Sequence, residues 1–117
     1  MKNILICLVF TTLVFTSFTP DQLIKTNMTI VVVNEQGAVV EGATVRLFKT
    51  INDYNNHKNH VQETKESNEK GVVKFTNIDA ISYYLQIEKG DLSNMFTEEK
   101  TEPLAPKKVN KFIIVIE

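Results

Sequence analysis

The chain is poor in the residues that most often build reactive sites or tight contact surfaces. Its 117 residues include no tryptophan, one cysteine and two histidines, and Arg46 is its sole arginine. The lone Cys7 lies inside an N-terminal apolar run. The rest of the chain therefore has no disulfide, no thiolate nucleophile and no cysteine ligand for a metal. A domain without these groups must be stabilised by its apolar core.

An excess of charge of either sign is also missing. The 13 basic and 14 acidic residues give a formal net charge of −1. The basic residues are scattered, and Lys107-Lys108 is their one adjacent pair. Nucleic-acid binding normally needs a basic patch or stripe, so the sequence predicts no nucleic-acid partner.

The N-terminus has the proportions of a secretory signal peptide. A short basic start, Met1 to Asn3, precedes the uncharged apolar run Ile4 to Phe18, which is shorter than the roughly 20 residues of a membrane span. We expect residues 1–19 to be the signal, although Phe18 and Pro20 make a poor cleavage site. Export to the periplasm, cell surface or medium follows. If the segment stays uncleaved, it is the one expected membrane contact.

The remaining residues, 20–117, are enough for one domain, and their hydrophobic pattern has a period of two. Such alternation, with one apolar face, is typical of strands that pack on one side only. Several such strands predict an all-β domain of two antiparallel sheets packed face to face. The expected strands are 28–33, 44–47, 72–75, 83–88 and 111–116, with the polar segment Val61–Ser67 as an edge strand.

Two Asn-Glu-x-Gly segments lie between these strands, Asn34 to Gly37 and Asn68 to Gly71. A tight turn needs a residue at positive φ, and glycine supplies it without a Cβ clash. The oxygens of these turns, with Asp79, could also bind calcium, but no Asp-x-Asp-x-Asp-Gly spacing is present. Turn formation is the alternative interpretation of the same residues.

The first turn opens a longer motif that identifies a family resemblance. Asn34 to Leu47, with Gly42-Ala43-Thr44-Val45-Arg46-Leu47, resembles the opening of a carboxypeptidase regulatory-like domain. Ser67 to Phe75 and Ser82 to Ile87 are similar to the segments that follow in that family. The resemblance, which extends to transthyretin-like and collagen-adhesin B-type domains, implies a seven-stranded antiparallel Greek-key β-sandwich of the prealbumin type. It also implies a non-catalytic module.

The chain departs from the family pattern at two points. Glu41 stands where the family usually has proline, and Ala80-Ile81 stands where it usually has Pro-Gly. The turn at Asp79–Ser82 must therefore be built differently. Collagen-adhesin B-type domains can also crosslink a lysine to an asparagine, for which Lys25 and Asn110 are the candidates. Because Lys25 precedes the apolar alternation, we expect no such bond.

Two polar segments interrupt the strand pattern, at 51–60 and 91–107. Both are expected to be long loops, or loops that hold a short helical turn. Long loops on a rigid sandwich commonly carry binding residues. The candidate residues for ligand or partner contact are Tyr54, His57, His60, Met95 and Phe96.

Catalytic and metal chemistry have little support in these loops. His57 and His60 are three residues apart and could share a metal with Asp53, or they could be two solvated loop residues. No nucleophile elbow accompanies any serine, so a Ser–His–acid triad is not expected. The sequence predicts that the protein is not an enzyme and has no cofactor or metal.

These observations predict an exported, non-catalytic β-sandwich module with a structural or binding role at a bacterial cell envelope. The alternative is a small carbohydrate- or peptide-binding protein that uses the 51–60 and 91–107 loops. The expected partner is an envelope protein, a glycan or a peptide.

Overall fold

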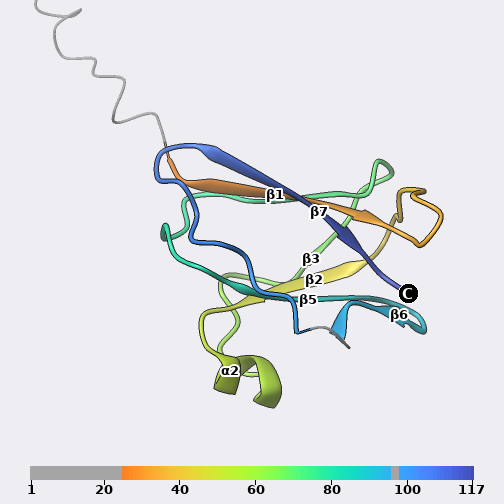
Figure 1. Cartoon of the computed structure of the whole chain (residues 1–117), viewed down its shortest axis with the longest axis horizontal. Coiled ribbons are helices and arrows are strands. Elements are labelled where there is room, and N and C mark those ends of the chain that lie inside the picture. Colours follow the sequence, from red (N-terminus) through yellow and green to blue (C-terminus); the bar gives the residue numbers. More distant parts are fainter. Residues whose placement is uncertain (1–24, 96–97) are drawn as a thin grey trace, which may run out of the picture.

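The computed structural model describes residues 25–95 and 98–117, which form two β-sheets packed face to face (Figure 1). The predicted signal segment, residues 1–19, lies outside the described residues. One sheet has the strand order β4-β1-β7 and the other the order β3-β2-β5-β6. The strands are β1 (Asn27–Val33), β2 (Thr44–Phe48), β3 (Lys65–Glu66), β4 (Val72–Phe75), β5 (Tyr84–Lys89), β6 (Leu92–Ser93) and β7 (Val109–Val115).

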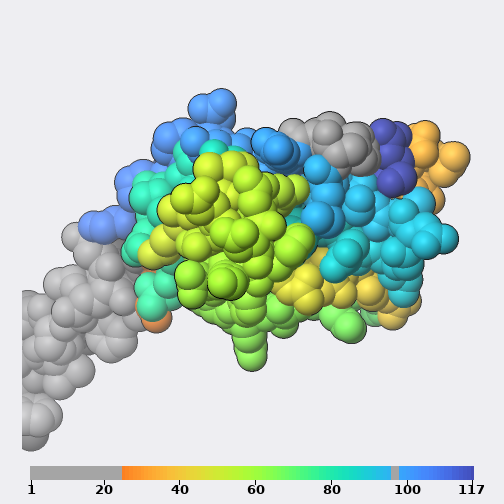
Figure 2. Space-filling view, turned by 90° about the horizontal axis from the view of Figure 1, so that it is seen from below, coloured from red at the N-terminus to blue at the C-terminus, as the bar shows by residue number. Residues whose placement is uncertain are grey.

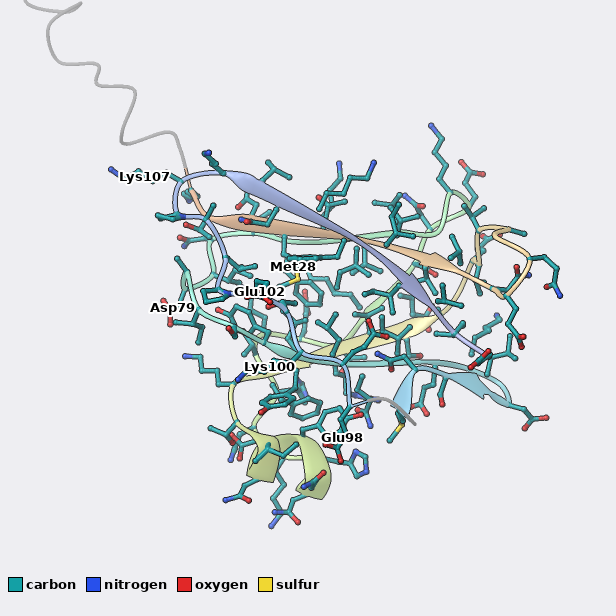
Figure 3. All side chains as sticks on the ribbon, in the orientation of Figure 1. Met28, Asp79, Glu98, Lys100, Glu102 and Lys107 are labelled. Carbon is teal, nitrogen blue, oxygen red and sulfur yellow. The ribbon has the colours of Figure 1, made fainter. Side chains whose placement is uncertain are left out.

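The core lies between the inner faces of the two sheets. The period-two pattern places its members correctly, since alternate residues of a strand face the same side. Figure 3 shows Met28 between the two sheets, where it is fully buried. The other strand residues expected on this apolar face are also buried, except for the half-buried Phe112. The buried members are Ile30, Val32, Val45, Leu47, Val73, Phe75, Tyr83, Leu85, Ile87, Ile114 and Ile116.

The expectation of fully antiparallel sheets is wrong at one pair of strands. β1 and β7 run parallel, with Asn27 paired to Val109 and Val33 to Val115. A parallel pair needs a long crossover connection rather than a hairpin. Here β7 is reached from the opposite sheet through residues 98–108, so it enters beside β1 in the same direction. The other strand pairs are antiparallel.

The two Asn-Glu-x-Gly segments form matching turns. The Asn34 Oδ1 accepts hydrogen bonds from the backbone N–H groups of Gln36 and Ala38, both at 3.0 Å. The Asn68 Oδ1 accepts from Lys70 and Val72, at 2.9 and 3.0 Å. In both turns these amide oxygens are therefore engaged by backbone donors, which is turn chemistry.

The turn at Asp79–Ser82, where the Pro-Gly of the family is missing, is stabilised by a side chain instead. The buried Tyr83 donates its phenolic O–H to the Asp79 carbonyl at 2.8 Å. The Ile81 N–H bonds to the same carbonyl oxygen at 3.0 Å. A tyrosine that bonds back to the backbone a few residues upstream has the arrangement of a tyrosine corner.

The two segments that interrupt the pattern contain more regular structure than loops alone. The first holds a short helix, α2 (Ile51–Asn56), consistent with the expected helical turn. The second begins with β6. The Glu99 carbonyl then accepts from the Leu85 N–H of β5, and the Thr101 N–H donates to the carbonyl of Tyr83, just before β5. By contrast, the edge strand expected at Val61–Ser67 shrinks to the two residues of β3. Gln62, at a φ of 58°, leaves the extended conformation there.

The edge of β5 is completed by the fully buried Asn94. Its Oδ1 accepts from the Ile87 N–H at 2.9 Å, and its Nδ2 donates to the Leu85 carbonyl at 3.0 Å. The side chain thus continues the hydrogen-bond ladder between β6 and the 99–101 segment. Within the described ranges, no helix has the length and apolar character needed to cross a membrane.

The two turn glycines offer a matched test of close packing. Both have positive φ, +81° at Gly37 and +75° at Gly71. A Cβ at Gly71 would lie 2.7 Å from the Val32 carbonyl oxygen, whereas a Cβ at Gly37 would meet nothing within 4 Å. We expect Gly37→Ala to cost about 1 kcal/mol and Gly71→Ala about 2–4 kcal/mol of unfolding free energy, as measured by urea denaturation. Equal losses would show that the backbone conformation alone sets the cost.

Candidate functional site

The outer face of the four-stranded sheet carries the side chains most suited to binding. Because Val45 and Leu47 point into the core, Arg46 and Phe48 of β2 point outward. Their register partners on β5 are Gln86 and Tyr84. Figure 2 views the molecule from this side, with α2 and its neighbours standing out beside the β5-β6 region.

An aromatic cluster fixes α2 against this face. Tyr54 of α2 packs edge-on against Phe48, with ring centroids 5.8 Å apart, and lies 5.9 Å from the Tyr84 ring. His60 adds an edge-on contact to Phe48 at 6.4 Å. Thr50 caps the helix by accepting from the Asp53 N–H at 3.1 Å. These contacts form a second apolar cluster outside the main core, and they hold the 51–60 segment in place.

A surface pocket of about 540 Å³ opens beside this cluster. It combines outward side chains of β2 and β5 with residues of both polar segments. Arg46, His57, His60, Thr64, Gln86, Glu88 and Met95 line it.

A hydrogen-bond network centred on Arg46 forms one part of this pocket. The Arg46 Nη1 donates to the Glu88 Oε1 at 3.2 Å and to the Gln86 Oε1 at 3.5 Å. The Arg46 Nε donates to the Thr64 Oγ1 at 3.2 Å. The guanidinium is thus held by partners from three directions, which fixes a side chain that would otherwise have many rotamers.

Gln86 connects this network to the loop residues. Its side chain is buried, and its Nε2 lies 2.7 Å from the His57 Nδ1, to which the amide donates. The same Nε2 lies 3.6 Å from the Met95 sulfur. The 51–60 and 91–107 segments therefore meet over one buried glutamine.

The structure brings three of the five predicted contact residues together. His57, His60 and Met95 line the same pocket. Tyr54, by contrast, is buried, with only 4% of its surface exposed, so it supports the site from beneath and is not a surface contact. The reason is the aromatic packing of α2 on the sheet, which the polar sequence of that segment did not reveal. Phe96 lies outside the described residues.

Four lining residues were missed by the sequence reasoning, namely Arg46, Thr64, Gln86 and Glu88. Three of them, Arg46, Gln86 and Glu88, occupy outward positions on predicted strands, so the alternation pattern already placed them on the outer face. Nothing in the pattern showed that a helix from a distant segment would form a wall beside them. The one feature of the sequence that could have pointed to this pocket is that Arg46 is the sole arginine.

The candidate metal ligands are engaged with other groups. The Asp53 Oδ1 accepts from the Asn59 Nδ2 at 3.2 Å, and the His60 Nδ1 bonds to the Gln62 carbonyl at 2.8 Å. Among the described residues, no group of three or more histidines, cysteines, aspartates or glutamates could hold a metal ion.

The two candidate crosslink residues lie in different environments. Lys25 is exposed, while the Asn110 amide bonds to the Asn27, Ala105 and Lys108 carbonyls. Within the described ranges, the buried polar side chains include neither a lysine nor an acid. The absence of a bond stays a prediction, which the intact mass of the protein would test.

Two carboxylates lie close to the aromatic cluster. Burial, and then the negative charges of Glu98 and Glu99, raise the pKa of the Tyr54 phenol above its usual value of 10.0. Figure 3 shows Glu98 above α2. Burial also raises the pKa of Glu99, and a hydrogen bond with Asn94 partly opposes that rise. Folding therefore shifts both groups toward their neutral forms relative to the unfolded chain.

Comparison with solved structures places this fold among several kinds of protein. The chain resembles the group B streptococcus pilus 2b backbone protein (TM-score 0.59, 14% identity, 77% of this chain and 40% of that one). It also resembles BcpA, the major pilin subunit of Bacillus cereus (0.52, 19%, 80% and 30%). A third similar structure is 3-chlorocatechol 1,2-dioxygenase from Rhodococcus opacus (0.54, 8%, 80% and 59%). The chain covers less than two thirds of each, and these identities show a shared fold alone.

No protein-family model and no curated protein matches the sequence. The comparisons with solved structures show that the chain has a β-sandwich fold that also occurs in pilus subunits.

The buried hydroxyl of Tyr54 gives a sharp stability test. Within the described ranges its oxygen has no hydrogen-bond partner, whereas the Tyr83 hydroxyl bonds to the Asp79 carbonyl. We expect Tyr54→Phe to raise the free energy of unfolding by up to about 1 kcal/mol, and Tyr83→Phe to lower it by about 1 kcal/mol. Urea denaturation of both variants checks this. A loss of stability in Tyr54→Phe would mean that the hydroxyl has a partner.

The raised pKa of Glu99 predicts a pH-dependent effect. A carboxyl whose folded pKa exceeds its unfolded value of 4.5 binds its proton more tightly in the folded state. The free energy of unfolding therefore falls as the pH rises through the folded pKa, because the folded protein must then give up that proton. Glu99→Gln should therefore stabilise the protein at pH 7, with the gain vanishing below about pH 4. Thermal denaturation across this range measures it. The exposed Glu102→Gln serves as the control, and a similar gain there would contradict the burial argument.

Proposed function

We propose that the protein is an exported, non-catalytic β-sandwich module with a structural or binding role at a bacterial cell envelope. The observation that carries this proposal is the two-sheet fold, shared over about four fifths of the chain with two pilus proteins. The signal-like start of the sequence is an independent support. In finer detail, we propose a Greek-key domain of the carboxypeptidase regulatory-like kind.

The chemistry of the pocket favours binding over catalysis. The Thr64 hydroxyl oxygen accepts from Arg46, and the described residues that line the pocket beside the histidines include no serine or cysteine. Arg46 is neutralised locally by Glu88. A nucleophile activated by an adjacent base, which covalent catalysis needs, has no counterpart among these lining residues.

A second candidate function is the binding of a carbohydrate or peptide in this pocket. It is favoured by the meeting of the 51–60 and 91–107 segments over Gln86. The lining offers an amide, two imidazoles and an ion pair, with Met95 as an apolar surface. Such groups both donate and accept hydrogen bonds, as the hydroxyl groups of a sugar or the backbone of a peptide require.

Localisation tests the first proposal. We expect native protein to be found outside the cytoplasm, with its mature N-terminus beyond the apolar run, because Met1 to Phe18 has the features of a secretory signal. Cell fractionation followed by N-terminal mass spectrometry measures both properties. Chemical crosslinking of intact cells would then identify the envelope partner. Soluble cytoplasmic protein that retains Met1 would contradict export, and that outcome would leave the pocket proposal to its own test.

Binding to glycan arrays and peptide libraries tests the second. For any ligand found, we expect His57→Ala and Met95→Ala to weaken binding by about tenfold each, since both side chains line the pocket. Lys74→Ala, an exposed change on the other sheet, is the control. Affinity unchanged in both pocket variants would place the ligand elsewhere.

A further inference from the structure

β7 forms a free edge of the three-stranded sheet. In a parallel pair, alternate residues of a strand direct their backbone groups to the neighbouring strand. The Asn27 N–H bonds to the Lys108 carbonyl, and the Ile116 N–H bonds to the Val33 carbonyl, so the even-numbered residues of this segment face β1. The odd-numbered residues of β7 therefore direct their N–H and C=O groups away from the sheet.

These outward backbone groups belong to Val109, Lys111, Ile113 and Val115. Among the described residues, none of them has a backbone hydrogen bond outside the β1–β7 pair. The edge thus offers four donors and four acceptors along one line. Unpaired groups of this kind are a template for another strand.

The side chains along this edge do little to block such pairing. Val109, Ile113 and Val115 are 64%, 65% and 45% exposed, and Lys111 is the one charged residue of the strand. Natural edge strands are usually protected by prolines, bulges, several charges or short length. β7 has seven residues and contains no proline.

The other edges of the sandwich are better protected. β4, at the opposite edge of the same sheet, has four residues, and the Lys65 ammonium bonds to its Lys74 carbonyl at 2.8 Å. The edge of β5 is closed by β6, Asn94 and the 99–101 segment. Just beyond β7, Glu117 exchanges two backbone hydrogen bonds with Ser93 of β6, at 3.0 and 3.2 Å. Among the described residues, the long uncovered edge is therefore β7 itself, Val109–Val115.

A pocket of about 230 Å³ opens next to the same edge. Phe112 and Ile114 of β7 line one side of it, and Leu85 with residues 99–102 lines the other. Figure 1 shows β7 and the preceding blue segment on the near side of the two sheets. A strand added to β7 would bring its inward side chains to this pocket.

We infer that β7 is a self-association edge, whose occupant is the antiparallel β7 of a second copy of this chain. Pairing centred on Phe112 matches all seven residues of both strands. Val109 then lies opposite Val115 of the second copy, and Lys111 lies opposite its Ile113. The two Phe112 rings meet on the inner face, at the mouths of the two pockets.

Charge and register both favour a second copy. In the register centred on Phe112, the two Lys111 side chains are diagonal, and each aliphatic stem covers the opposing Ile113. A two-residue slip that places the lysines directly opposite leaves strand ends unpaired. The protein's net charge of −1 adds little repulsion between copies. The result is a six-stranded sheet with two-fold symmetry.

The test is sedimentation equilibrium of the full-length protein, combined with amide hydrogen exchange. We expect a concentration-dependent dimer in which the Lys111 and Ile113 amides become protected as the dimer forms. Ile113→Pro removes an N–H that does not bond to β1, so it should leave the fold intact and weaken dimerisation by about tenfold or more.

Ile113→Lys is a second variant that keeps the backbone donor, because a proline in a strand can unfold a domain. It should also weaken the dimer, whereas Val39→Lys, at an exposed apolar residue away from β7, should not. A monomer at all concentrations would overturn the inference, even if β7 binds some other peptide. A dimer that survives both Ile113 variants would also overturn it, because its interface would lie elsewhere.

Discussion

The packing of one apolar sheet face against the other is the constraint on which the remaining structure depends. It fixes which side of every strand is inward, from Met28 on β1 to Ile114 on β7. Since side chains alternate with a period of two, it also fixes the outward set. Arg46 and Gln86 point to the outer face because their neighbours Val45 and Leu85 point into the core. The site and the free edge are consequences of the same alternation.

The pocket shows how a second, smaller cluster can turn a flat sheet face into a walled pocket. α2 covers Phe48 and Tyr84 through Tyr54, and in doing so it places His57 and His60 above the strands. The buried Tyr54 hydroxyl has no hydrogen-bond partner in the described part of the chain. The aromatic contacts offset the energetic cost of burying it. The helix thus forms a wall of the pocket, and the packing of Tyr54 sets its position. Its polar residues face the solvent.

The fold is shared both with pilus subunits and with a dioxygenase, and this bears directly on the functional proposal. Since pilus proteins and a dioxygenase have the same two-sheet fold, function has to be argued from the site. In this chain several of the pocket residues bond to one another. The β7 edge adds a different kind of surface, in which the backbone provides the contacts. The two surfaces lie on different sheets, so a dimer formed through β7 leaves the pocket accessible.

The sequence by itself determined the five longer strands, their inward faces and the two asparagine turns, because these depend on local periodicity and on hydrogen bonds between near neighbours. It also placed His57, His60 and Met95 in the segments that line the pocket. Only the tertiary structure decided that β7 runs parallel to β1, that Tyr54 is buried and that Asn94 completes the edge of β5. Each of these depends on contacts between residues on different elements, and alternation within one strand carries no information about which distant segment will pack beside it.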